Sequence, residues 1–381
     1  MHRTLFDADH EAFRELMRDF VDRTLRPRAD AHAREHRIDR ECWLEAGRQG
    51  ILGLEVGEEY GGSAVGDYRF NAVFHEELAV FGAAYASSFG IHADVVAPYL
   101  VELGTEEQKK EWLPRFCRGE IITAIAMTEP SGGSDLANLR TSAVADGGDW
   151  ILNGAKTFIT NGGSADLVVV AARTGPGARA RGVSLFLVDA GLPGFQRGRV
   201  LDKVGQPESD TAELFFDDLR VPADALLGEV GRGFVAMMER LPQERIGVSI
   251  GNIANAASIF TETLDYIKQR TAFGQPVGSF QHNKFKAAEM YTRLEVTQAF
   301  VDACVQAHAR RELTAEDAAM AKWWTAEVQN DVLDECLQLH GGYGYMNEYR
   351  VARAWKDARV NKIWAGSNEI MKELIGRKLG L

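Results

Sequence analysis

Hydrophobic periodicity changes twice along this chain, near residues 120 and 230, and this constrains the fold most. Up to residue 120, and again from residue 231, apolar residues recur every three or four positions, as in amphipathic helices. Between these points, short apolar runs alternate with Gly- and Asp-rich turns. The sequence therefore predicts an α+β protein with an N-terminal helical domain (1–120), a middle β domain (121–230) and a C-terminal helical domain (231–381).

The individual patterns give the expected elements. Helices are predicted at residues 9–26, 70–81 and 106–117, the last opened by a capping box of Thr105 and Gln108. Strand-like runs lie at residues 121–127, 141–145, 150–152, 167–172, 183–188 and 213–216, typical of a small antiparallel sandwich or barrel. Helices expected at 242–270, 281–311 and 315–340 suit a four-helix bundle, with Thr314 as N-cap and Gly341 at the C-terminal end of the last.

Composition excludes several classes of function. Forty-three basic against 55 acidic residues leave a net charge of −12, so we expect no nucleic-acid partner. The four cysteines, Cys42, Cys117, Cys304 and Cys336, form no C-x-x-C pair, so neither a metal site nor a disulfide framework is predicted. This fits a cytoplasmic protein. No run approaches the roughly 18 apolar residues that a membrane span needs.

Two segments together suggest a site for a flat cofactor. The loop from Thr128 to Asp135 is rich in glycine and hydroxyl side chains, so its backbone N–H groups can approach a ligand closely. Phe158 and Thr160 then place an aromatic face and a hydroxyl at the end of a later strand. A surface turn is the commoner reading of such a loop taken alone.

Glu244 is the candidate catalytic residue. We expect Pro242 at the first position of the longest helix, which would put Glu244 in the first turn. The helix dipole there favours the ionised carboxylate, whereas burial raises its pKa, so Glu244 is a reasonable general base. An ordinary first-turn acid is the commoner reading from composition alone.

Four motifs give the chain a family resemblance. The chain resembles the acyl-CoA dehydrogenase family of flavoproteins over nearly its whole length. The motifs that carry the resemblance are IAMTEPSGGSD, RTAFGQPVGSFQ, QLHGGYGY and DARVNKIWAGSNEIM. The resemblance implies bound FAD and a homotetramer built as a dimer of dimers. It also implies FAD contacts within one subunit and across an interface, from Ile125, Met127, Thr128, Gly133, Ser134, Phe158, Ile159, Thr160, Arg270, Phe273, Gln281, Gln338, Gly341, Gly342, Ser367 and Glu369.

The resemblance also bears on the base. Most members carry a glutamate in a late turn where this chain has Ala365, whereas the long-chain and isovaleryl members resemble this chain in placing it at the position of Glu244. Glu244 is therefore assigned as the base. Substrate contacts are expected from Ser134, Arg245, Ala365 and Gly366.

The implied activity is α,β-dehydrogenation of acyl-CoA, most like the long-chain members, with electrons passed to an electron-transfer flavoprotein. Three alternatives remain open. The substrate could be carried by an acyl carrier protein, the enzyme could be an oxidase that uses oxygen, or the chain could be a flavin-free scaffold.

Overall fold

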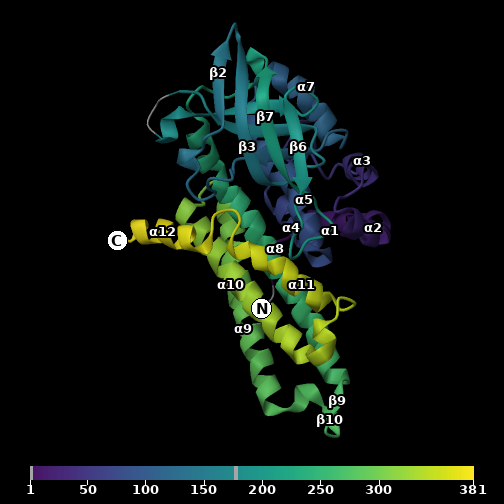
Figure 1. Cartoon of the computed structure of the whole chain (residues 1–381). Coiled ribbons are helices and arrows are strands. Elements are labelled where there is room, and N and C mark those ends of the chain that lie inside the picture. Colours follow the sequence, from purple (N-terminus) through teal and green to yellow (C-terminus); the bar gives the residue numbers. More distant parts are fainter. Residues whose placement is uncertain (1–2, 176–178) are drawn as a thin grey trace.

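In the described residues, the N-terminal part of the chain consists of seven α-helices joined by loops and short π- and 3-10 turns. The computed structural model describes residues 3–175 and 179–381 (Figure 1). The predicted helix at residues 9–26 is confirmed and continues past α1 through a π-helical turn at Val21–Leu25. The capping box also forms, since Gln108 N donates to Thr105 Oγ1 at 3.2 Å. The helices are α1 Ala8–Phe20, α2 Ala29–Glu35, α3 Arg40–Arg48, α4 Arg69–Phe81, α5 Ala83–Gly90, α6 Ala97–Leu103 and α7 Glu106–Cys117.

The middle of the chain is one sheet wrapped around an apolar core. Its strands are β1 Thr123–Ala126, β2 Ser142–Asp146, β3 Asp149–Thr160, β4 Leu167–Arg173, β5 Val183–Asp189, β6 Phe195–Val200, β7 Thr211–Val221 and β8 Leu226–Leu227. They follow the order β6-β7-β3-β2-β4-β5-β8, with β1 beside β4. Most pairs are antiparallel, as predicted, but β1–β4 and the single β2–β4 bridge are parallel.

The C-terminal part is a helical bundle. It contains α8 Gly233–Gln269, α9 Gln281–Ala309, α10 Ala315–His340, α11 Arg350–Ala358 and α12 Asn368–Lys378, with the short strands β9 Thr271–Ala272 and β10 Gln275–Pro276 between α8 and α9. The predicted cap at Thr314 forms, since its side chain accepts from the N–H of Asp317 at 3.1 Å. In Figure 1 the β domain lies beyond one end of the bundle, whereas β9 and β10 mark the opposite end.

The start of α8 was predicted wrongly. The helix begins at Gly233, so Pro242 is inside it and Glu244 lies roughly three turns from its N-terminus, beyond the strongest effect of the helix dipole. Phe234, Met237 and Met238 pack in the cluster between the N-terminal helices and the sheet. The burial of these side chains stabilises the residues before Pro242 as helix. It offsets the cost of a proline in a helix interior, which is about 3 kcal/mol.

Gly247 lets α8 lie against the N-terminal helices. A methyl group on this residue would approach His75 Nε2 to 2.7 Å and Asp94 Oδ2 to 2.8 Å, closer than real contacts allow. We expect Gly247→Ala to lower the free energy of unfolding by about 1–3 kcal/mol, because a well-packed interior resists added volume. Chemical denaturation measures this, with Gly376→Ala in α12 as control. No atom within 4 Å opposes a methyl group there, so a destabilised control would contradict the steric argument.

Candidate functional site

The glycine-rich loop after β1 is anchored by a buried ion pair. Lys156 Nζ lies 2.9 Å from Glu129 Oε1 and donates to the carbonyl of Met127 at 3.1 Å. The Lys156 side chain is fully buried. Glu129 also accepts the backbone N–H of Thr141 at 2.9 Å, and the N–H of Thr157 donates to Thr128 O at 3.0 Å. The two segments that the sequence paired are thus one structural unit.

The end of β3 displays an aromatic ring beside this loop. Phe158 has φ +60° and is 68% exposed, at an irregularity in the pairing with β7, whereas Ile159 is buried and offers only its backbone. Asn161 is also left-handed, with φ +62°. Its amide holds it there by donating to the carbonyls of Ser88 and Thr123 at 2.9 and 3.1 Å. Such costly backbone conformations in non-glycine residues cluster at functional sites.

These two features fit a flavin. A methyl group on Gly132 would meet no atom within 4 Å, and Ser134 is exposed, so the loop backbone is open to a ligand. The exposed Phe158 ring offers a stacking face, and Thr160 is half-buried at the same strand end. The loop and the strand end therefore have the donors and the aromatic surface that a flat heteroaromatic group requires.

Glu244 is a half-buried acid with an altered pKa. Its Oε1 lies 3.4 Å from the hydroxyl of Tyr99 in α6. Burial raises the pKa of Glu244 to about 7, against the opposing pull of the Arg245 guanidinium. Tyr99 belongs to the hydrophobic cluster against which Met127 packs. One apolar cluster therefore connects the candidate base with the strand that leads into the cofactor loop.

Two cations fix the late turn at Ala365 and Gly366. Both residues are left-handed, with φ +52° and +89°. Arg245 Nε donates to Ala365 O at 3.4 Å, and Lys322 Nζ donates to Gly366 O at 2.5 Å. Lys322 is fully buried, and burial together with the nearby Arg245 charge lowers its pKa to about 7. Ser367 follows as the N-cap of α12. The turn therefore has a defined backbone but no carboxylate at position 365.

A second set of predicted residues lies at the other end of the bundle. Glu244 and Arg270 are separated by most of α8, roughly 40 Å of helix. Arg270 lies over the ring of Tyr343 at 5.8 Å, and Phe273 is 98% exposed. Six exposed residues lie at or next to the C-terminal ends of α8 and α10 and the start of α9: Arg270, Phe273, Gln281, Gln338, Gly341 and Gly342. The strand β9, directly after α8, marks this end of the bundle in Figure 1. Within one chain, these six residues do not join the site around Glu244.

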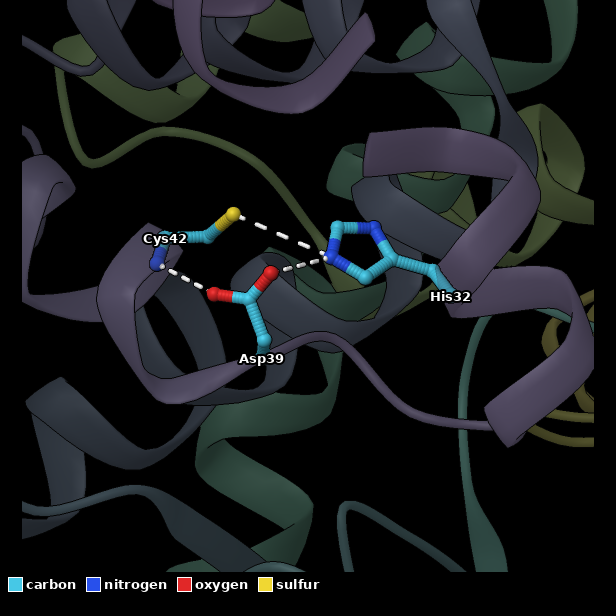
Figure 2. Close-up of side chains that lie close together, drawn as sticks. All are labelled: His32, Asp39 and Cys42. Carbon is cyan, nitrogen blue, oxygen red and sulfur yellow. Dashed lines mark hydrogen bonds and ion pairs between the residues drawn. The ribbon is translucent and has the colours of Figure 1, made fainter. Parts of the chain in front are cut away.

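Figure 2 shows a compact cluster elsewhere, in the N-terminal helices. The nearest ligand-type atoms of His32, Asp39 and Cys42 lie within 4.8 Å of one another. Asp39 accepts from the Cys42 N–H at 3.1 Å and lies 2.9 Å from His32 Nε2, while Arg28 is 3.5 Å away. Burial raises the pKa of the Cys42 thiol to about 12. Asp39 therefore caps the N-terminus of α3 and also binds the ring of His32.

Comparison with known proteins establishes the family. Residues 7–120, 124–219 and 231–380 match the N-terminal, middle and C-terminal domains of acyl-CoA dehydrogenases. The chain belongs to the acyl-CoA dehydrogenase family. It is similar to the mitochondrial long-chain specific acyl-CoA dehydrogenases of Sus scrofa (47% identity) and Mus musculus (48%), in each case over 99% of this chain and 88% of the relative.

Solved structures agree. An acyl-CoA dehydrogenase from Geobacillus kaustophilus superimposes with a TM-score of 0.97 and 47% identity, over 99% of both chains. A glutaryl-CoA dehydrogenase from Mycobacterium smegmatis, solved in complex with FADH2, gives a TM-score of 0.92 and 29% identity over 98% of this chain and 95% of that one. Family membership makes the protein an oxidoreductase with FAD as its cofactor. Across the described residues, every helix is too short or too polar to cross a membrane.

The raised pKa of Glu244 has a consequence for stability. Because the folded-state pKa of about 7 exceeds the ordinary 4.5, this group's contribution to stability is full below pH 4.5 and is lost as pH rises through 7. Glu244→Gln removes this titration. We therefore compare the free energies of unfolding of the variant and the native protein. We expect the variant's value minus the native value to increase by about 2–3 kcal/mol from pH 5 to pH 8. Denaturation at both pH values measures the difference, and a difference that does not change with pH would contradict the pKa.

Proposed function

We propose that this protein catalyses α,β-dehydrogenation of long-chain acyl-CoA thioesters to trans-2-enoyl-CoA, with Glu244 as the general base. The observation that carries the proposal is the half-buried Glu244 carboxylate, whose pKa of about 7 matches neutral pH, in a chain that has alanine at position 365. A base works best when its pKa lies near the working pH. Glu244 would take a proton from the carbon next to the thioester carbonyl.

The remaining residues position and polarise the substrate. Bound FAD, held by the loop and the β3 strand end, supplies the hydride acceptor. The backbone N–H of Ala365 would donate to the thioester carbonyl, which acidifies the neighbouring carbon. Arg245 and Lys322 support this role because they bind the carbonyls of the same turn. Ser134 and Gly366 are the other proposed substrate contacts.

Chain length, electron acceptor and assembly are also part of the proposal. The 47–48% identity to long-chain specific relatives supports a long-chain substrate. Electron-transfer flavoprotein is the proposed acceptor. The six exposed residues at the far end of the bundle, among them Arg270 and Gly342, support a homotetramer. In it, this end would contact the FAD of a neighbouring subunit. A cytoplasmic location stays a prediction.

Anaerobic titration of the purified flavoprotein with straight and branched acyl-CoAs tests the proposal. We expect the visible flavin band to bleach fastest with long straight chains. Faster bleaching by acyl groups on a carrier protein would instead favour the carrier-bound reaction. Rapid hydrogen peroxide formation under air would identify an oxidase. Purification as a colourless protein that binds no flavin would favour a scaffold.

A further inference from the structure

A buried polar cluster surrounds Gln243, the residue before the proposed base. Asp94, in the π-helical turn Ile91–Val96, is at its centre and is only 1% exposed. Its Oδ2 lies 2.8 Å from His75 Nε2 and accepts from the hydroxyl of Tyr68 at 3.1 Å. Its Oδ1 accepts from the Asn71 amide at 2.7 Å. Three side chains in or next to α4 therefore bind the single carboxylate of Asp94.

Gln243 connects this cluster to α8. Its Nε2 donates to Asp94 Oδ1 at 3.0 Å, to Asp94 O at 3.1 Å and to Glu55 Oε1 at 3.0 Å. Its Oε1 lies 3.1 Å from Nε2 of His308 in α9. The side chain of Gln243 therefore holds three parts of the chain together: the loop before α4, the turn that carries Asp94, and α9.

The backbone of α8 needs an external hold at this point. Pro242 has no N–H, so the helix lacks one i→i−4 hydrogen bond immediately before Gln243. Proline in a helix interior also bends the chain. The hydroxyl of Tyr68 lies 3.5 Å from the carbonyl of Gln243, and Gly247 lets the next turn lie against His75 and Asp94. The helix is thus fixed from the side just where its own hydrogen bonding is interrupted.

We infer that Gln243 is a positioning residue for the dehydrogenation. Its hydrogen bonds to Asp94 and Glu55 fix the rotation of α8 at Pro242, and thereby the direction in which Glu244 projects. This inference rests on the proposed role of Glu244 as base. A displacement of about 1 Å in a reacting group costs on the order of 100-fold in rate, so loss of the clamp should slow proton abstraction without removing the base.

Gln243→Met, in the FAD-loaded protein, tests the inference. Methionine keeps the length of the side chain but removes every hydrogen bond. We expect the rate of anaerobic flavin reduction at saturating acyl-CoA to fall about 10–100-fold, with FAD retained and KM nearly unchanged. The matched control is Gln329→Met, because Gln329 is another glutamine whose side chain is held by hydrogen bonds between helices, with Asn255 and Asn361 as its partners in the bundle. The control is expected to lose stability but keep its reduction rate.

The pH profile separates positioning from general destabilisation. Burial is the main cause of the raised pKa of Glu244, and the charged and polar groups that also act on it are Arg245, Tyr99, Asp94 and Arg240. If Gln243→Met lets the base turn towards water, the apparent pKa of flavin reduction falls below that of the native protein, whereas Gln329→Met leaves it unchanged. A native rate and pH profile in Gln243→Met would overturn the inference. Glu244→Gln is measured alongside: if that variant keeps its activity, the assignment of the base fails instead.

Discussion

Glu244→Gln is expected to lower the rate of anaerobic flavin reduction by acyl-CoA by about 100- to 10,000-fold, the range that a general base contributes. Glutamine keeps the shape of the side chain, but it cannot take the proton. FAD should stay bound, because Glu244 is not among the residues of the loop or the β3 strand end. Stopped-flow absorbance of the flavin band measures the rate.

Glu239→Gln on the same helix is the matched control. The side chain of Glu239 is 63% exposed, and its ion pair with Arg240 is long, at 3.8 Å. Its neutralisation should change neither the flavin spectrum nor the reduction rate. If Glu239→Gln slows the reaction as much as Glu244→Gln does, the effect belongs to the charge of the helix and not to a base.

Lys156→Met is expected to have the largest effect on stability. It leaves the Glu129 carboxylate, which also accepts the Thr141 N–H, without its cation. Removal of one partner from a buried ion pair costs about 3–5 kcal/mol. Because the same lysine joins the two segments that we propose hold FAD, we also expect loss of FAD during purification. Chemical denaturation and the flavin-to-protein absorbance ratio measure the two effects.

The double variant Glu129→Gln/Lys156→Met shows whether the ion pair itself matters. Removal of both charges leaves no unpaired buried ion, so much of the stability should return. FAD affinity should recover less, since the double variant still lacks the hydrogen bond from the Lys156 side chain to the carbonyl of Met127. A single Lys156→Met variant that is as stable as the native protein and fully yellow would contradict this account of the loop.

Local patterns predicted the longer helices and most of the strands, but not the shorter helices α2, α3, α5, α6, α11 and α12. Caps such as Thr105 and Thr314 depend on residues three positions apart, so the sequence alone identifies them. The start of α8 could not be predicted in this way. Proline strongly favours the first turn of a helix, and only the packing of Phe234 and Met237 against distant helices overrides that preference. Strand β6 was missed because it lies at the edge of the sheet and is rich in charged and polar residues.

Only part of the candidate site could be predicted from sequence motifs, and the rest depends on the fold. Motifs led to the proposed cofactor loop and to Glu244, but not to the groups that hold them. Tyr99 and Lys322 approach Glu244 and Gly366 across long stretches of sequence, 145 and 44 positions, and no local pattern marks either. The pKa of Glu244 was expected to reflect opposing effects of the helix dipole and burial. Because α8 begins at Gly233, Glu244 is too far from the N-terminus for a strong effect of the helix dipole. Burial is the main cause of the raised pKa.

The assignment of Glu244 is tested most directly by following anaerobic flavin reduction with a long-chain acyl-CoA as a function of pH, in native protein and in Glu244→Gln. The native rate should rise with pH as a single group with a pKa of about 7 ionises, and then level off. Glu244→Gln should retain only a small residual rate without that titration. A variant that reduces its flavin at the native rate, with the native pH dependence, would show that another group removes the proton.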